Sequence, residues 1–296
     1  MNMQTKMQDV VGLTKIAPLS RRGFMSSSAA AAAGYTLAAG PVRADAIQTD
    51  ASGLTVGDAK IKVSGGDMPI YYARPAGVQK PPIILVCMEI FGLHQYIKDV
   101  TRRLGKLGAF AIASDYYFRK GTDLTKITDI PQLMPIVNSK PDAELLSDLD
   151  ATVAWAKSQG GDTSRLGIMG FCRGGRTVWE YAAHNKDIKA GVAFYGSLVD
   201  PPAQKSLWPK NPIELAPEMK APVLGLYGEA DQGIPVSQVD TLKGALQTAG
   251  KTFEIKIYPG APHGFHADYR PSYRQDAAED AWNQMIAWFK KYKVLA

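Results

Sequence analysis

Cysteine is scarce in this sequence, with only two among 296 residues. So few thiols exclude a disulfide-rich scaffold and a metal site built from clustered cysteines. No run reaches the roughly 18 strongly apolar residues of a membrane-spanning helix, so stable membrane insertion is not expected. Nucleotide-binding loops of the forms G-x-x-x-x-G-K-[ST] and G-x-G-x-x-G are also missing from the sequence. We therefore expect neither a nucleotide nor any other cofactor.

The excess of basic residues is small. Lys and Arg number 34 against 28 acidic residues, a formal charge of +6. Residues 1–46 hold five basic and two acidic side chains, so this segment carries +3 and the rest of the chain about +3. Such a mild surplus does not indicate a nucleic-acid surface. The composition, with 46% hydrophobic and 21% charged residues, is that of a globular protein.

The first 46 residues contain the three parts of a secretory signal in order. A basic region contains Arg21-Arg22, a stretch rich in Ala, Gly and Ser covers 26–41, and Ala44-Asp45-Ala46 forms an Ala-x-Ala cleavage site. The paired arginines make the segment resemble a twin-arginine signal. We expect export by the twin-arginine machinery, cleavage after Ala46 and a bacterial periplasmic location for domain 47–296. The alternative is a disordered tail with a chance Arg-Arg pair.

The remaining chain alternates short apolar runs with helical patterns, which predicts a doubly wound, mostly parallel α/β sheet. Apolar positions recur every three or four residues within 97–107, 145–156 and 274–292. The first two runs have no helix between them, which predicts an antiparallel edge. A proline-rich connection over 201–217 is too long for an ordinary loop, so it covers something or carries a short helix. The predicted strands contain IKV (61–63), IYYA (70–73), IILVC (83–87), AFAIA (109–113), RLGIM (165–169), AGVAFY (190–195), VLGLY (223–227) and FEIKIY (253–258).

One motif indicates covalent chemistry. Gly170-Phe171-Cys172-Arg173-Gly174 has the form G-x-C-x-G, between a predicted strand and a predicted helix. This is the setting of a nucleophile elbow, in which flanking glycines permit a tight, strained turn. The helix N-terminus favours the thiolate of Cys172, and the N–H of Arg173 can donate to an oxyanion. The alternative is a buried structural cysteine beside a glycine turn.

Two partners for Cys172 follow in the order of an α/β-hydrolase triad. Asp231 comes after the predicted strand at 223–227, and His263 comes after the one at 253–258. Open α/β sheets place their active sites past such strand ends. His263 would accept the thiol proton, and Asp231 would fix the tautomer of the imidazole. Taken singly, Asp231 could be a turn residue and His263 a loop histidine.

At this point the sequence resembles the dienelactone hydrolase (carboxymethylenebutenolidase) family over about residues 55–293. Four segments carry the resemblance: VCMEIFGLHQYIKDVTRRLGKLGAFAIASDYYFRKG, GFCRGG, GEADQGIP and YPGAPHGFHADYRPSY. The resemblance implies an α/β-hydrolase fold, with about eight strands and helices on both faces. It also implies a Cys172, Asp231 and His263 triad that opens small-molecule esters or lactones.

The resemblance assigns further residues to the site. Glu89 helps to deprotonate Cys172, and the N–H of Ile90 is the second oxyanion donor. Arg119 holds Glu89 or a substrate carboxylate, and Tyr195 lines the pocket. A structural alternative for Glu89 is a strand-end carboxylate paired with an arginine.

The sequence departs from the family pattern around the triad histidine. Gly264 and Ala267 stand where the best-studied type has Ser and a carboxylate-binding Arg. The missing arginine puts dienelactone itself in doubt, although Arg270 lies nearby and could substitute. His94 replaces a common Asn and is expected at the pocket.

Three functional readings remain open at this stage. The first is hydrolysis of dienelactone-like substrates, and the second is a periplasmic esterase or thioesterase for other small acyl groups. The third is a non-catalytic, redox-responsive binding protein in which Cys87 caps Cys172. His263 and His266 lie three residues apart without other ligands at suitable spacing, so no metal site is expected. The chain is expected to be a monomer or a dimer.

Overall fold

The computed structural model describes residues 46–296. The predicted signal segment, except for Ala46, lies outside the described residues, so its paired arginines and apolar stretch stay a prediction. Within 46–296, none of the helices has the length and apolar character needed to cross a bilayer.

All eight predicted strands are present and form one sheet, as the alternating pattern predicts. The spatial order is β1-β2-β4-β3-β5-β6-β7-β8. The strands are β1 (Leu54–Val63), β2 (Gly66–Pro75), β3 (Pro82–Cys87), β4 (Phe110–Ser114), β5 (Asp162–Phe171), β6 (Ile188–Phe194), β7 (Val223–Gly228) and β8 (Phe253–Tyr258).

Strand direction follows the hydrophobic pattern. β1 and β2 form an antiparallel pair, and β2 is also antiparallel to β4. From β4 to β8 every neighbouring pair is parallel. All residues of β3, β4 and β7 are buried, as expected for strands covered on both faces. The exposed residues of β1 are those of an edge strand, so the predicted antiparallel edge is confirmed.

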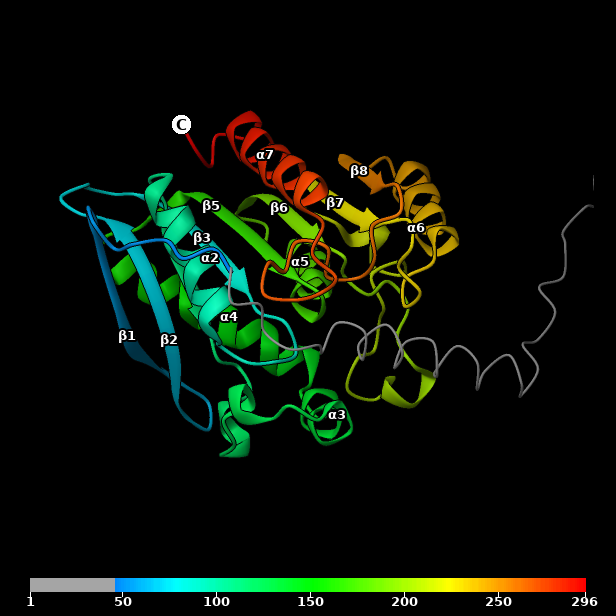
Figure 1. Cartoon of the computed structure of the whole chain (residues 1–296), viewed down its shortest axis with the longest axis horizontal. Helices are drawn as coiled ribbons and strands as arrows, with labels where there is room; N and C mark the ends of the chain where they lie inside the picture. Colours follow the sequence, from blue (N-terminus) through cyan, green and yellow to red (C-terminus); the bar gives the residue numbers. More distant parts are fainter. Residues whose placement is uncertain (1–45) are drawn as a thin grey trace, which may run out of the picture.

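Helices cover both faces of the sheet. α2 and α7 lie on the face toward the viewer in Figure 1, while α4 and α5 pack against each other on the opposite face. The predicted start of α4 at Pro141-Asp142 is confirmed, as is the final helix. The sequence analysis did not predict α3, which contains a proline, or α6. The helices are α2 (Gln95–Lys106), α3 (Ile130–Asn138), α4 (Asp142–Ser158), α5 (Arg173–His184), α6 (Val236–Thr248) and α7 (Gln275–Lys291).

The proline-rich connection covers the beginning of α5. It carries two short 3-10 turns, Pro202–Gln204 and Ala216–Glu218. Between them the buried Trp208 stacks under the guanidinium groups of Arg173 and Arg176, 4.5 and 4.9 Å from its ring centroid. Arg176 also binds Asp200 at 2.6 Å, which fastens the connection to α5. The segment after the nucleophile motif is thereby held firmly in place.

Candidate active site

Cys172 occupies the sharp turn between β5 and α5. Its backbone angles are φ 55° and ψ −116°, in the half of conformational space that non-glycine residues rarely adopt. The Cys172 N–H donates to the carbonyl of Phe194 at 3.0 Å, which holds the strained turn against β6. This is the elbow geometry that the motif predicts, and such strain is typical of functional residues.

The glycines of the motif are required by close packing. A Cβ on Gly170 would lie 2.3 Å from the carbonyl oxygen of Gly174. A Cβ on Gly174 would lie 2.1 Å from the carbonyl oxygen of Cys87, at the end of β3. The beginning of α5 therefore touches the end of β3, which brings Arg173 and Ile90 to the same edge of the sheet as Cys172.

His263 and Asp231 meet as the sequence predicts. His263 Nδ1 lies 2.7 Å from Asp231 Oδ2. The other carboxylate oxygen, Oδ1, accepts the backbone N–H groups of Gly233 and Ile234 at 2.9 and 3.1 Å. Both oxygens of Asp231 are thus fixed, so the carboxylate has one orientation in which it can hold the imidazole.

The pKa of His263 depends on both Asp231 and Cys172. Burial alone would lower the pKa of His263, but the carboxylate of Asp231 and the sulfur of Cys172 raise the pKa well above its ordinary value. Hydrogen bonding to both groups contributes to that rise. His263 therefore stands between the acid and the thiol, as a triad base does.

Glu89 is buried at the end of β3, with only 3% of its surface exposed. Tyr269 donates a hydrogen bond to Glu89 Oε2 at 2.8 Å, and His94 Nε2 lies 3.3 Å from the same oxygen. Burial alone would raise the pKa of Glu89, but His94, Arg270 and Tyr269 outweigh it and hold the pKa at about 2. Glu89 is thus a buried, ionised carboxylate at the carboxyl edge of the sheet.

The predicted contact between Arg119 and Glu89 is wrong. Arg119 instead makes a two-point ion pair with Asp148, at 2.8 and 2.7 Å, and its Nε donates to the carbonyl of Ser64. Asp148 is almost fully buried on α4, and Glu144 adds a contact at 3.2 Å. Because all three guanidinium nitrogens are engaged there, Arg119 joins the β1–β2 turn to α4 rather than reaching a substrate.

Tyr195 lies beside the imidazole of His263. It is fully buried at the end of β6, with a positive φ of 36°. Its ring packs edge-on against the ring of His263, with centroids 5.0 Å apart. Neither of the cavities described below has Tyr195, Cys172 or His263 in its walls, so the role of Tyr195 in lining the substrate pocket stays a prediction.

The comparisons with known proteins identify the family of the chain. The model of the dienelactone hydrolase family matches residues 68–293. The chain belongs to that family. A Methylorubrum extorquens protein described as a putative carboxymethylenebutenolidase is 52% identical over 289 residues, 97% of this chain and 98% of that protein. A Bradyrhizobium protein described as a probable 2-oxo-3-(5-oxofuran-2-ylidene)propanoate lactonase is 31% identical, over 78% of this chain and 92% of its own length.

A solved structure shares the fold closely. The crystal structure of a putative dienelactone hydrolase from Klebsiella pneumoniae has a TM-score of 0.78 and 46% sequence identity. The match covers 81% of this chain and 99% of that structure. Together with the family match, this establishes an ester or lactone hydrolase on an α/β-hydrolase fold.

Two cavities are described in this member of the dienelactone hydrolase family. The larger one lies beside Glu89 and its partners His94 and Tyr269. It measures about 1130 Å³ and its walls include Phe91, His94, Tyr269 and Arg270. The guanidinium of Arg270 lies 4.0 Å from the Phe91 ring centroid, and its Nε and Nη1 are buried without a hydrogen-bond partner among residues 46–296. A buried cation with free donors is costly unless something fills the cavity and accepts those bonds.

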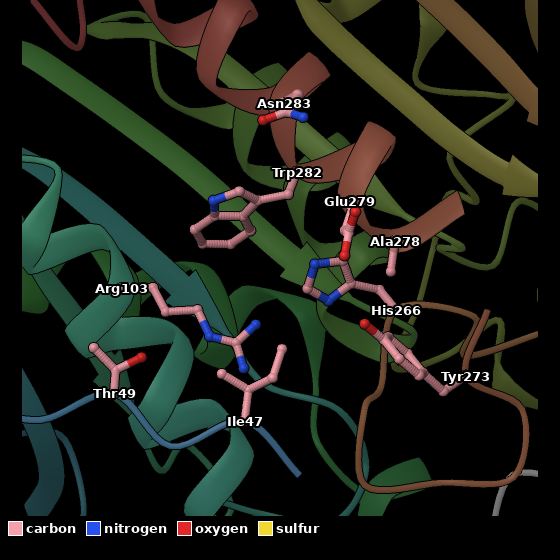
Figure 2. Close-up of a pocket in the computed structure, with 9 residues that line it drawn as sticks. All are labelled: Ile47, Thr49, Arg103, His266, Tyr273, Ala278, Glu279, Trp282 and Asn283. Atoms are coloured by element: carbon pink, nitrogen blue, oxygen red, sulfur yellow. The ribbon is translucent and has the colours of Figure 1, made fainter. Parts of the chain in front are cut away.

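A smaller cavity of about 400 Å³ lies between α2, α7 and the loop after β8. Figure 2 shows His266, Trp282 and Arg103 around it. His266 is buried, and its Nδ1 lies 2.6 Å from the hydroxyl of Tyr96. Burial and the nearby charge of Arg103 lower the pKa of His266 to about 3, so the ring is neutral at neutral pH. His266 is thus bound to Tyr96 and separate from the pair that His263 forms with Asp231.

Both cysteines are free and buried. Burial raises the pKa of Cys87, as expected for an inert core thiol. The sequence analysis missed Tyr269 and Tyr96. Tyr96 packs between the rings of Phe171 and Tyr269, at 5.4 and 5.2 Å. Both tyrosines stand in segments that carry the family resemblance, but only the three-dimensional packing brings them to Glu89 and the elbow.

Proposed function

We propose that this protein hydrolyses small esters or lactones that carry a carboxylate, dienelactone-like compounds among them, through a Cys172–His263–Asp231 triad. The observation that carries the proposal is the position of His263, bonded to Asp231 through Nδ1 and electrostatically coupled to Cys172 on the strained elbow. A thiol, a base and a buried acid in this order support covalent acyl transfer.

The proposed reaction has two stages. Cys172 loses its proton to His263, with help from Glu89 when substrate is bound, and the thiolate attacks the carbonyl carbon. The N–H groups of Ile90 and Arg173 stabilise the oxyanion. The C–O bond breaks as His263 gives its proton to the departing alkoxide or enolate, and an acyl-thioester remains on Cys172. Water then gives a proton to His263 and attacks the thioester, the C–S bond breaks to release the acid, and His263 returns the proton to the sulfur of Cys172.

Arg270 supports a substrate with a carboxylate. Arg270 lines the large cavity, two of its buried donors have no hydrogen-bond partner among residues 46–296, and the position of the family's usual arginine is occupied by Ala267. A planar guanidinium binds a carboxylate through two parallel hydrogen bonds. The Bradyrhizobium relative is named for a lactone substrate that itself carries a carboxylate, in agreement with this assignment.

A second candidate is hydrolysis of larger acyl substrates by the same residues. The cavity of about 1130 Å³ exceeds the range of about 300–1,000 Å³ typical of sites for drug-sized ligands. A small lactone would leave most of it empty. A panel of esters and thioesters with increasing acyl length separates the two candidates, because the larger substrates gain kcat/KM only under the second.

We also propose that the protein acts in the periplasm after twin-arginine export and cleavage after Ala46. The order of basic region, apolar stretch and Ala-x-Ala site supports this proposal. The test is cell fractionation of the protein beside a variant with Arg21→Lys and Arg22→Lys, followed by N-terminal sequencing. Accumulation of both proteins in the cytoplasm would contradict export.

The function is tested by dienelactone ring opening, followed in the ultraviolet, with Cys172→Ala alongside. Turnover that disappears in the variant supports both the substrate class and the nucleophile. Equal turnover by the two proteins would exclude Cys172 as the nucleophile. If neither turns over dienelactone, the ester and thioester panel decides the substrate.

A further inference from the structure

We propose that the hydroxyl of Tyr195 is a further catalytic group, which donates a hydrogen bond to the sulfur of Cys172 when that sulfur becomes a thiolate. The inference rests on the proposed function, in which Cys172 is the nucleophile. It goes beyond the expected place of Tyr195 in the pocket wall, because it gives the phenol a contact with a reacting atom. No proton is transferred in this contact, since the phenol keeps its proton throughout.

The hydroxyl of Tyr195 is buried and has nothing to bond to. The side chain is fully buried, and its Oη is one of the buried polar atoms without a hydrogen-bond partner among residues 46–296. Such an arrangement is costly for stability and uncommon in folded proteins. Two other buried phenols are satisfied, because Tyr181 donates to Asp150 at 2.8 Å and Tyr116 donates to the carbonyl of Met88 at 3.0 Å. The unused donor of Tyr195 is therefore a candidate for a role in the reaction.

The backbone and the packing fix the ring of Tyr195 beside His263. A φ of 36° is an outlier for a bulky residue, and strain of this kind gathers at functional sites. The backbone N–H donates to the carbonyl of Leu226 at 2.8 Å. The ring packs edge-on against His263 and Phe265, with centroids 5.0 and 5.4 Å apart. The phenol is thus held in place next to the imidazole that is coupled to Cys172.

The sulfur of Cys172 is the acceptor that remains for this hydroxyl. The ionisable groups that act electrostatically on the Tyr195 phenol are Tyr96, Glu89, Tyr269 and Cys172. The hydroxyl of Tyr96 is already bonded to His266 at 2.6 Å, and that of Tyr269 already donates to Glu89 at 2.8 Å. Cys172 gains a negative charge in the proposed reaction, so it becomes a strong acceptor at the step where a donor is useful.

Tyr195 remains a donor while the thiol ionises. Burial, together with the neighbouring acidic groups, raises the pKa of the phenol well above its ordinary value. A neutral thiol is a weak acceptor, which agrees with the lack of a bond to Cys172 in the resting structure, whereas bonds to an ionised acceptor are shorter and stronger. Catalytic hydrogen bonds often tighten only as charge develops, and a donor held in a dry site needs little reorganisation to meet that charge.

The other groups that act on Cys172 stabilise a thiolate by means of charge. His263, on the loop after β8, interacts with the sulfur by charge and by a hydrogen bond, and Arg270 adds a positive charge from farther along the same loop. The N-terminus of α5 adds its partial positive charge. From the segment after β4, the phenol of Tyr117 is also within electrostatic reach. Tyr195 differs from the cations because its hydrogen bond is neutral and directional.

The test is Tyr195→Phe in the full-length protein. Phe keeps the ring and its contact with His263, and it removes only the hydroxyl. We expect kcat/KM at neutral pH to fall about 10- to 100-fold on the ester or lactone that the wild type hydrolyses, the range for a lost hydrogen bond to a charged group. The pKa of Cys172 should rise by about one pH unit, so the loss of activity is largest below that pKa and shrinks above it. The pKa is measured from the ultraviolet absorbance of the thiolate that disappears when Cys172→Ala is added to each protein.

Urea denaturation separates a catalytic hydroxyl from a structural one. Removal of an unpartnered hydroxyl from the interior should raise the urea midpoint of Tyr195→Phe while activity falls. Tyr181→Phe is the matched control, because that buried phenol on α5 has a partner in Asp150. We expect the control to lower the urea midpoint and to keep the wild-type kcat/KM and the wild-type pKa of Cys172.

Three results would overturn the role of Tyr195 alone. They are an unchanged pKa of Cys172 in Tyr195→Phe, a loss of activity accompanied by a lower urea midpoint, and a change in the pKa of His263 when Tyr195→Phe is made in the Cys172→Ala protein. The last result would mean that the hydroxyl acts on the imidazole rather than on the sulfur. Full turnover by Cys172→Ala would instead overturn the proposed function, whatever the titration of the thiol shows.

Discussion

The hydroxyl of Tyr269 donates a hydrogen bond of 2.8 Å to Glu89, which lies 180 residues earlier in the chain. This bond joins the loop after the triad histidine to the end of β3, next to the elbow. The predicted partner Arg119 is bound to Asp148 instead. The carboxylate of Glu89 is therefore held by the same loop that carries His263, so the two groups are positioned together.

Replacement of Tyr269 by Phe should destabilise the protein most at neutral pH. The pKa of Glu89 is lowered from its ordinary 4.5 to about 2, so its ionised form stabilises the fold above pH 4.5. That contribution is lost as the pH falls from 4.5 toward 2. We expect a loss of about 1.5–3 kcal/mol in the free energy of unfolding at pH 7, typical of a hydrogen bond to a charged group. Urea denaturation of both proteins at pH 7 and near pH 2 measures it, and an undiminished difference at the lower pH would contradict this account.

Asp231→Asn should nearly abolish turnover without unfolding the protein. The amide keeps the shape of the side chain but removes the charge that raises the pKa of His263. We therefore expect the pKa of His263 to fall and kcat to drop by about 10⁴-fold, as for the equivalent change in other triads. Steady-state kinetics and an NMR titration of His263 report the two effects. Glu229→Gln, an exposed neighbour whose carboxylate accepts the N–H of Gly260, is the control and should retain full activity.

Arg270→Met should raise KM selectively for substrates that carry a carboxylate. The buried guanidinium has two donors without partners, and Met keeps the apolar contact with Phe91 while removing the charge. Loss of a charge-assisted bidentate contact should raise KM about 10- to 100-fold. The neutral methyl ester of the same substrate should show little change. Arg274→Met, an exposed arginine in the same segment, is the control. An equal effect on the acid and its methyl ester would show that Arg270 does not bind the carboxylate.

The sequence was sufficient for the parts of the site that follow local rules. The Gly170–Gly174 motif predicts a strained turn wherever it stands between a strand and a helix. Asp231 and His263 follow the ends of parallel strands, which places them at the same edge of the sheet. All three are found where expected. These positions depend on a few neighbouring residues and on the parallel sheet, which the alternating hydrophobic runs determine.

The partners of Glu89 could not be obtained in the same way. Choosing between Arg119 and Tyr269 depends on where Asp148 falls on α4 and on the path of the loop after β8. Asp148 is buried and offers Arg119 two oxygens, and this long-range pairing leaves no local pattern in the sequence. The helix at 130–138 was missed for a related reason, because Pro131 and Pro135 argue against a helix when tertiary contacts are unknown.

Gly174→Ala provides the sharpest test of the elbow packing. The added Cβ would lie 2.1 Å from the carbonyl oxygen of Cys87 and 2.7 Å from that of Met88, both backbone atoms that have little room to move. We expect a loss of about 3 kcal/mol, the upper end for overpacked interiors, together with loss of activity. Gly244→Ala on the exposed side of α6 meets nothing within 4 Å and should stabilise the protein by about 0.5–1 kcal/mol. Denaturant unfolding of the two variants measures the contrast. Stability changes of the same sign in both would mean that α5 shifts away from β3 to accept the methyl group, and the elbow would then be less rigid than its geometry indicates.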